Sequence, residues 1–143
     1  TEIGEEWVNL RRRAMRILQQ EAELEEIVRL VGVDALSPRD QLTMEVARSI
    51  REDYLHQNAF HEIDTYTSLN KQLALLRIVL TFADVGLALL EKGIEIQEIL
   101  ALKIRERIAQ AKFIPEDKTE EFTKLQTDLE RLAKDTELAG EVL

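Results

Sequence analysis

The most apolar stretch of the sequence, residues 69–91, reads LNKQLALLRIVLTFADVGLALLE, and it decides the fold. Its apolar residues recur at steps of three and four, which is the spacing of one face of an α-helix. This stripe comprises Leu69, Leu73, Leu76, Leu80, Ala83, Leu87 and Leu90. The other faces carry Leu75, Ile78, Val79, Phe82 and Val85. A helix that is apolar on nearly every side is predicted to be central and buried, and Gly93 is predicted to break the chain after it.

The apolar core of this stretch, Leu73 to Leu90, is 18 residues long, which borders on the length of a membrane span. It contains Arg77 and Asp84, and full charges in the middle of a span are costly in lipid. The sequence therefore favours a helix buried in a protein core over a helix that inserts into a membrane.

A long amphipathic helix is predicted before it, from about Glu5 to Val31. Its stripe is Trp7, Leu10, Ala14, Ile17, Leu24, Val28 and Val31, with Glu21 as the one interruption. Leu18, Ile27 and Leu30 widen the stripe, so we expect the helix to pack on more than one neighbour. Gly32 follows at the position of a left-handed cap residue, which predicts the end of the helix.

Residues 34–40, DALSPRD, predict the start of a second helix. Ser37 can cap the helix, and Pro38 stands at the first helical position, where its missing N–H costs nothing. Asp40 lies in the first turn, where the helix dipole favours an anion. The inner face of this helix is predicted to carry Leu42, Val46, Ala47, Ile50, Tyr54 and Leu55.

Helical spacing fails between Gln57 and Ser68, where the chain reads QNAFHEIDTYTS. This segment is predicted to be an ordered irregular loop, and its many hydrogen-bonding side chains are typical of a functional loop. After the central helix, a fourth helix is predicted from about Glu95 to Lys112. A short last helix, with the stripe Phe122, Leu125, Leu129 and Leu132, is predicted to lie at the edge.

Composition supports this fold. The chain has 143 residues, 45% of them apolar, with only five glycines and two prolines. The expected fold is an all-α bundle of about five helices in a single domain, residues 1–143. The chain begins Thr1-Glu2-Ile3 without a Met, so we expect it to be processed or cut from a larger protein, and no secretory signal opens it.

Several chemistries are excluded. There is no cysteine, and the net charge of −9 argues against binding nucleic acid or an anionic membrane surface. No glycine is followed by lysine, so there is no phosphate-binding loop. The two histidines, His56 and His61, do not share a helical face, and Asp53-x-x-His56 has no second copy, so no metal site and no catalytic residue are predicted.

A basic patch lies on the first helix, at Arg11, Arg12, Arg13 and Arg16. Glu21, Glu23, Glu25 and Glu26 follow on the same helix. A solvated, salt-bridged helix face explains this pattern. Contact with an acidic partner subunit is the functional alternative.

Three segments together carry a family resemblance. The first runs from Trp7 to Ser37 and includes EAEL at 21–24 and LVGVDALS at 30–37; the second is DQLTME at 40–45; the third runs from Ile50 to Ser68. Over residues 5–92, the chain resembles the C-terminal helical domain of the catalytic A subunit of archaeal and vacuolar-type rotary ATPases. The segment from Gln57 to Ser68 is the most specific part of the resemblance.

The resemblance implies a fragment of a larger subunit, from which a barrel and a nucleotide-binding domain are absent. It implies a role in coupling ATP synthesis or hydrolysis to rotation of a central shaft and to ion transport. The implied partners are the non-catalytic B subunit and the shaft subunits. ATP or ADP with Mg would be bound by the full subunit, whereas no cofactor and no ATP hydrolysis are expected of this chain alone. The implied location is the cytoplasm, peripheral to the cell membrane.

The resemblance also implies two sites. The loop from Asp34 to Asp40 aligns with the shaft-contacting loop of related machines, and the contact residues would be Asp34, Leu36, Ser37, Pro38, Arg39 and Asp40. The segment from Gln57 to Ser68 would lie near the adenine end of the nucleotide pocket. Phe60 would press on the base, with Asn58 and Tyr66 as further candidates; Phe60 as a plain core residue is the alternative.

A function of another class stays open from the residues alone, namely a free-standing helical adaptor without a nucleotide role. The reading frame upstream of Thr1 separates the two. A phosphate-binding loop there supports the rotary machine, and a start codon just before Thr1 supports the adaptor.

Overall fold

The computed structural model describes residues 2–55 and 69–134. Within these ranges it has six α-helices, three shorter helical segments and no strand, which confirms the all-α prediction. The elements are α1 (Glu2–Val31), η1 (Val33–Ala35), α2 (Pro38–Ser49), η2 (Ile50–Leu55), α4 (Leu69–Glu91), α5 (Ile96–Leu100), α6 (Ile104–Gln110), η4 (Ala111–Phe113) and α7 (Thr119–Lys134). Of these, η1 and η4 are 3-10 turns and η2 is a π-helical turn.

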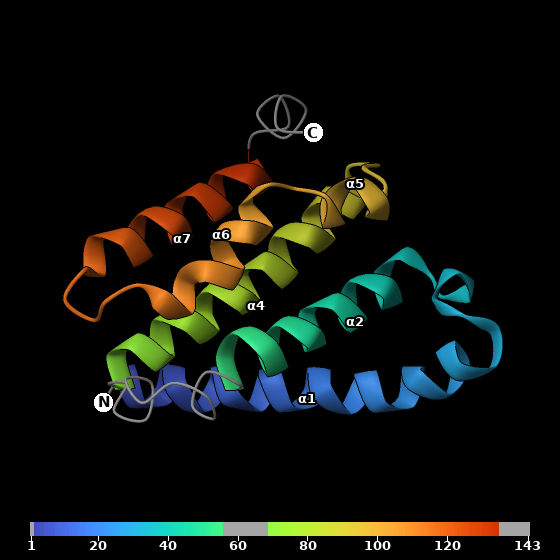
Figure 1. Ribbon diagram of the computed structural model, residues 1–143, viewed down its shortest axis with the longest axis horizontal. Helices are drawn as coiled ribbons and strands as arrows, with labels where there is room; N and C mark the ends of the chain where they lie inside the picture. Colours follow the sequence, from blue (N-terminus) through green and yellow to red (C-terminus); the bar gives the residue numbers. More distant parts are fainter. Residues whose placement is uncertain (1, 56–68, 135–143) are drawn as a thin grey trace.

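The central helix is α4, with the bounds that the sequence predicts. It contacts α1, α2, α5 and α7, and it crosses the molecule between α7 and the α1–α2 pair (Figure 1). Leu76 and Leu89 on this helix are fully buried. Its chain then turns through Gly93, which adopts a φ of 90°. The predicted central position is confirmed.

By length and composition, α4 is also apolar enough to cross a membrane, but 61% of its apolar window is buried inside the bundle. The two charges within that window are ion-paired to α1. The Arg77 Nε donates to Glu6 at 2.7 Å, and Asp84 accepts from Arg13. These features are those of a core helix, as predicted.

The first two helices form an antiparallel hairpin at one side of the bundle (Figure 1). Gly32 ends α1 with a φ of 89°, a left-handed conformation that glycine adopts without strain, as predicted. Further along the hairpin, the rings of Trp7 and Tyr54 meet edge to face at 6.4 Å. A close approach joins α2 to α4, because a Cβ on Gly86 would lie only 2.8 Å from the side chain of Leu42.

The prediction that Leu55 lies on the inner face of the second helix is wrong, since this side chain is 48% exposed. The other five predicted residues of that face are buried. The reason is the π-helical turn from Ile50 to Leu55, whose i→i+5 spacing differs from the 3.6-residue period on which the prediction was based.

The predicted fourth helix is also wrong as a single element. A turn at residues 101–103 separates α5 from α6, and η4 follows α6 directly. A straight helix would place Leu102 opposite the stripe of Ile96, Leu100 and Ile104, whereas the break lets Leu102 reach the core with 2% exposure. The Arg105 Nη1 donates to the carbonyl of Leu100 at 3.0 Å and stabilises the turn.

The last helix follows its prediction. α7 buries its whole predicted stripe, which comprises Phe122, Leu125, Leu129 and Leu132. It packs mainly on α4 (Figure 1), and the Gln126 Nε2 donates to the Thr81 hydroxyl at 2.7 Å across this contact.

Candidate functional site

The six predicted shaft-contact residues lie together in the turn that joins α1 to α2. Asp34 belongs to η1, Leu36 and Ser37 connect the two elements, and Pro38 to Asp40 open α2. Leu36 is buried, at 6% exposure, so it supports the turn from inside and offers little surface to a partner. Ser37, Pro38 and Arg39 are exposed.

Hydrogen bonds hold this turn at several points. The Ser37 hydroxyl accepts from the backbone N–H of Asp40 at 3.1 Å, which confirms Ser37 as the N-cap. The Gln41 Nε2 donates to the carbonyl of Leu36 at 3.0 Å, and the Leu36 N–H donates to Val33 at 3.0 Å. These side chains therefore satisfy backbone groups of the turn that would otherwise be unpaired.

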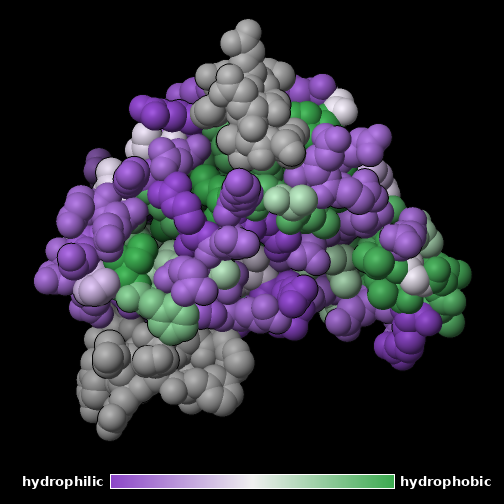
Figure 2. Space-filling model, turned by 45° about the horizontal axis from the view of Figure 1, so that its top comes forward, coloured by the Kyte–Doolittle hydropathy of each residue, from purple (hydrophilic) through white to green (hydrophobic). Residues whose placement is uncertain are grey.

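Beside the turn, the structure exposes an apolar surface that sequence reasoning missed. We call it the apolar tip: Ile27 (44% exposed), Leu30 (79%), Val31 (66%) and Val33 (45%). Apolar residues gather at the end of the molecule that carries this turn (Figure 2). The prediction that the first helix packs on more than one neighbour is confirmed, because α1 contacts both α2 and α4. Ile27 and Leu30, which were expected to widen its buried stripe, are exposed, and so is Val31 of the stripe itself. No described element extends far enough to cover the last turns of α1.

The predicted adenine-end residues Asn58, Phe60 and Tyr66 lie outside the described residues, as do His56 and His61. The flanking elements are described, however. η2 leads into this segment, and α4 follows it. Among the described residues, no three side chains of the metal-binding types gather closely enough to hold an ion.

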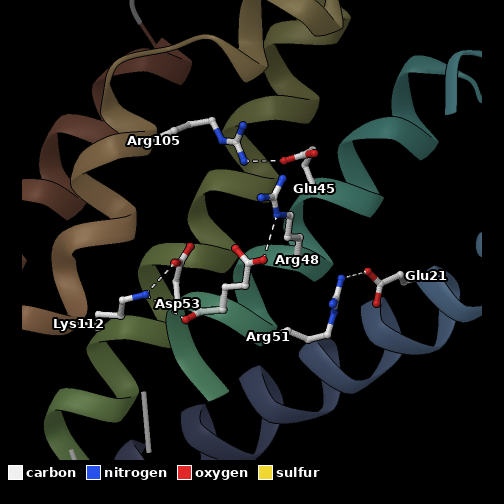
Figure 3. Close-up of polar contacts among 8 residues, drawn as sticks. Glu21, Glu45, Arg48, Arg51, Asp53, Arg105 and Lys112 are labelled. Carbon is white, nitrogen blue, oxygen red and sulfur yellow. Dashed lines mark hydrogen bonds and ion pairs between the residues drawn. The ribbon is translucent and has the colours of Figure 1, made fainter. Parts of the chain in front are cut away.

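A polar network surrounds η2 on the side that faces α6 and η4 (Figure 3). The Arg105 Nη2 lies 2.8 Å from Glu45, and the Arg48 Nε lies 3.2 Å from Glu52. The Lys112 Nζ lies 3.5 Å from Asp53. Burial raises the pKa of the Asp53 carboxyl above its ordinary range, and this effect outweighs the attraction of Lys112.

A further ion pair explains the interruption in the stripe of α1. Glu21 is buried at 7% exposure and pairs with Arg51 of η2 (Figure 3). A buried carboxylate is tolerated only when it is paired. Its partner lies thirty residues away along the chain, so no signal within the first helix could identify it.

The arginines of the basic patch on α1 make different contacts. Arg11 lies over the Trp7 ring at 5.8 Å, and Arg13 pairs with Asp84. Arg16 lines a groove between α1 and α2 together with Arg39 and Asp40. Two of the four arginines are therefore engaged within the chain, in line with a salt-bridged helix face. Contact of the others with an acidic partner remains a prediction.

Comparison with known proteins gives one family. The family described as the C-terminal domain of V and A type ATP synthase matches residues 1–100. The V-type ATP synthase alpha chain of Acetivibrio thermocellus is 59% identical over 128 residues, which cover 89% of this chain and 22% of the relative. That of Clostridium novyi is 54% identical over 130 residues, covering 90% and 22%.

A third relative, V-type ATP synthase alpha chain 1 of Clostridium tetani, is 48% identical over 141 residues, which cover 99% of this chain and 24% of the relative. The chain thus spans less than a quarter of the length of these relatives. Similarity to the alpha chains continues beyond the segment that the family model matches, into α6, η4 and α7.

Proposed function

Because the chain belongs to the family of C-terminal domains of V- and A-type ATP synthases, we propose that it transmits force between the catalytic alpha chain and a rotating central shaft. In this proposal the turn from Asp34 to Asp40, with the apolar tip beside it, touches the shaft. The non-catalytic B subunit is the neighbour in the ring. The full subunit binds ATP or ADP with Mg, and the complex moves ions while its catalytic part stays peripheral to the membrane. The free-standing adaptor gains no support from this family.

The apolar tip is the observation that carries the proposal. A 30-residue helix is about 45 Å long. A C-terminal domain is joined to the rest of its subunit through its N-terminal end, and the tip lies at the opposite end of α1 (Figure 1). Exposed apolar side chains at that end, with no described element over them, fit a contact with a different subunit.

The loop itself carries little charge. Asp34 and Asp40 are its acids, and Arg39 offsets one of them. A net charge of −1 at an exposed position contributes little to binding in physiological salt. The hydrogen bond of the Ser37 cap and the fixed φ of Pro38, by contrast, hold the start of α2. We therefore expect the stiffness of the turn, more than its charge, to determine coupling.

Two variants of the full alpha chain, assembled in its complex, test this expectation. Ser37→Gly with Pro38→Gly loosens the start of α2, whereas Asp34→Asn with Asp40→Asn removes the charge. The loosened variant should lose more ATP-driven ion transport per ATP hydrolysed than the neutralised one. The opposite ranking would show that charge, rather than stiffness, transmits the force.

The second part of the proposal is that residues 57–68 contribute to the adenine end of the nucleotide site, with Phe60 stacked on the base and Asn58 and Tyr66 beside it. The family resemblance of this segment supports it. Phe60→Ala in the full subunit should weaken nucleotide binding by about 1–3 kcal/mol, the value of one base–aromatic stack. Titration calorimetry measures this affinity. An unchanged value would support the alternative that Phe60 is a core residue.

A further inference from the structure

A second stripe of regularly spaced residues lies on the side of α1 that faces away from the bundle. Its positions advance by alternating steps of four and three, so they share one face of the helix. All of its members are exposed, and they are Val8, Arg12, Met15, Gln19, Ala22 and Glu26. We call this set the outer stripe.

The described elements leave the outer stripe open. α1 lies along one edge of the bundle, and α2 and α4, which it contacts, lie on the same side of it (Figure 1). Two apolar side chains of the stripe therefore stand in solvent, with Val8 at 51% and Met15 at 62% exposure. They are one heptad apart, which is the spacing by which apolar side chains join paired helices.

The charges of α1 change sign along its length. The arginines at 11, 12, 13 and 16 lie in its first half, and the glutamates at 21, 23, 25 and 26 lie in its second half. On the outer stripe itself, Arg12 makes no ion pair with any described residue. Glu26 pairs with Arg29, but both side chains are largely exposed, and a carboxylate can accept from a second donor.

A second copy of α1, placed antiparallel on the first, matches this order of charges. Arg12 and Glu26 each lie seven residues from Gln19, so each arginine meets the glutamate of the other copy. Met15 then lies beside Ala22 of the second copy, and Gln19 lies on the two-fold axis. In such a symmetric contact every pair occurs twice. A parallel arrangement would instead place arginine against arginine.

We propose that the outer stripe of α1 binds a second copy of this chain, with the two α1 helices antiparallel. Met15 and Ala22 form the apolar centre of the contact, and Arg12 and Glu26 form its two charged ends. A single pair of helices is a small interface, so the dimer is weak, and its exposed charges make it sensitive to salt. The inference goes beyond the proposed function and does not depend on it.

Sedimentation equilibrium of the chain tests the proposal. One copy has a mass of 16.5 kDa. We expect the average mass to rise toward twice this value as the chain concentration is raised to about 300 µM at low ionic strength. Salt at about 0.5 M should lower the average mass again, because it screens the charged ends of the contact.

Charge reversals identify the surface. Arg12→Glu and Glu26→Arg each set like charges against one another at both ends, and each should raise the Kd of the dimer at least tenfold. The double variant restores opposite charges and should return the Kd to within threefold of the parent. Fourteen residues separate the two positions, about 21 Å along the helix, so such a recovery requires a second copy. Met15→Glu, at the apolar centre, should also raise the Kd at least tenfold.

Two control variants accompany these. Lys124→Glu makes the same change of charge on α7, where Lys124 is exposed and makes no ion pair with a described residue, and it should dimerise as the parent does. Val31→Gln alters the apolar tip and leaves the outer stripe intact, so it should not change the Kd. Circular dichroism checks that each variant is folded, and Met15→Gln replaces Met15→Glu if the latter does not fold.

Three results would overturn the inference. A chain that stays at the mass of one copy over the whole concentration range does not pair with itself, and its outer stripe is left to a partner of another sequence. A dimer that Val31→Gln abolishes is joined through the apolar tip. A dimer in which the double reversal binds no more tightly than the single reversals does not have the antiparallel arrangement. Each of these results leaves the proposed coupling function standing.

Discussion

The regions beside the two ends of the segment formed by α2 and η2 are built in opposite ways. At its start, the apolar tip leaves large aliphatic side chains in solvent, with Leu30 at 79% exposure. At its end, charged groups are buried in a cluster of Glu52, Asp53, Lys71 and Lys112, which we call the η2 junction; Lys71 is 6% exposed and Asp53 is 9% exposed. Each arrangement reverses the usual preference for apolar residues inside and charged residues outside.

The difference indicates where the partners of each region lie. The buried charges of the η2 junction find their partners within the chain, on η4 and α4. The exposed aliphatic side chains of the apolar tip find none among the described elements, and in the proposed function their partner is the shaft. One region thus has its partners within the described chain, and in the proposed function the other serves assembly. Three predictions test this division.

The largest effect is expected for the ion pair between α1 and η2. Arg51→Met leaves the buried Glu21 carboxylate without its partner and should lower the free energy of unfolding by roughly 1–3 kcal/mol. The loss stays below that of a fully buried pair because the Arg51 side chain is 49% exposed. Urea denaturation of the chain at neutral pH measures it.

Glu21→Gln is the matched variant, because it removes the charge without leaving an unpaired carboxylate, and its cost should be smaller. If Arg51→Met lowers the free energy of unfolding no more than a surface substitution does, Glu21 is adequately solvated. The ion pair between α1 and η2 then does not stabilise the domain.

An intermediate effect is expected at the turn beside the apolar tip. Ser37→Ala removes the acceptor for the Asp40 N–H and should cost about 1 kcal/mol of unfolding free energy. Leu30→Gln, on the exposed tip itself, should change that free energy by less than about 0.5 kcal/mol. Thermal unfolding followed by circular dichroism ranks the two. A cost for Leu30→Gln that exceeds the cost for Ser37→Ala would mean that the tip is packed within the chain.

The smallest effect is a difference in pH dependence between two carboxyls. Burial raises the pKa of Asp53, so its contribution to stability is present below the ordinary aspartate pKa and declines as pH rises through the raised value. The hydrogen bond from Arg77 lowers the pKa of Glu6, so its contribution is present above the ordinary glutamate pKa and is lost as pH falls through the lowered value. The stability difference between each variant and the parent should therefore change with pH in opposite directions.

Urea titrations of Asp53→Asn and Glu6→Gln across the acidic range measure these differences. Raising the pH should improve Asp53→Asn relative to the parent and weaken Glu6→Gln relative to it. The second change should remain below about 1 kcal/mol, because the Glu6 side chain is 40% exposed. Slopes of the same sign would show that Lys112 outweighs burial at Asp53.

The sequence determined the helix boundaries that depend on neighbouring residues. Gly32 ends α1 and Ser37-Pro38 opens α2, because capping and left-handed φ values act within a few residues. The period of the apolar residues likewise identified α4 and the buried stripe of α7. For the candidate sites, the sequence located the turn from Asp34 to Asp40 but not the apolar tip.

Only the tertiary structure decided which apolar faces are covered and which charges are paired. Val31 continues the predicted apolar stripe of α1, yet it is exposed, because burial depends on whether another element reaches that turn. Glu21 breaks the pattern, yet it is buried, because Arg51 approaches it from thirty residues away. Lys112 meets Glu52 and Lys71 across 60 and 41 residues of sequence. Such contacts bring together residues that are remote in the sequence, and the spacing of residues along a single helix cannot predict them.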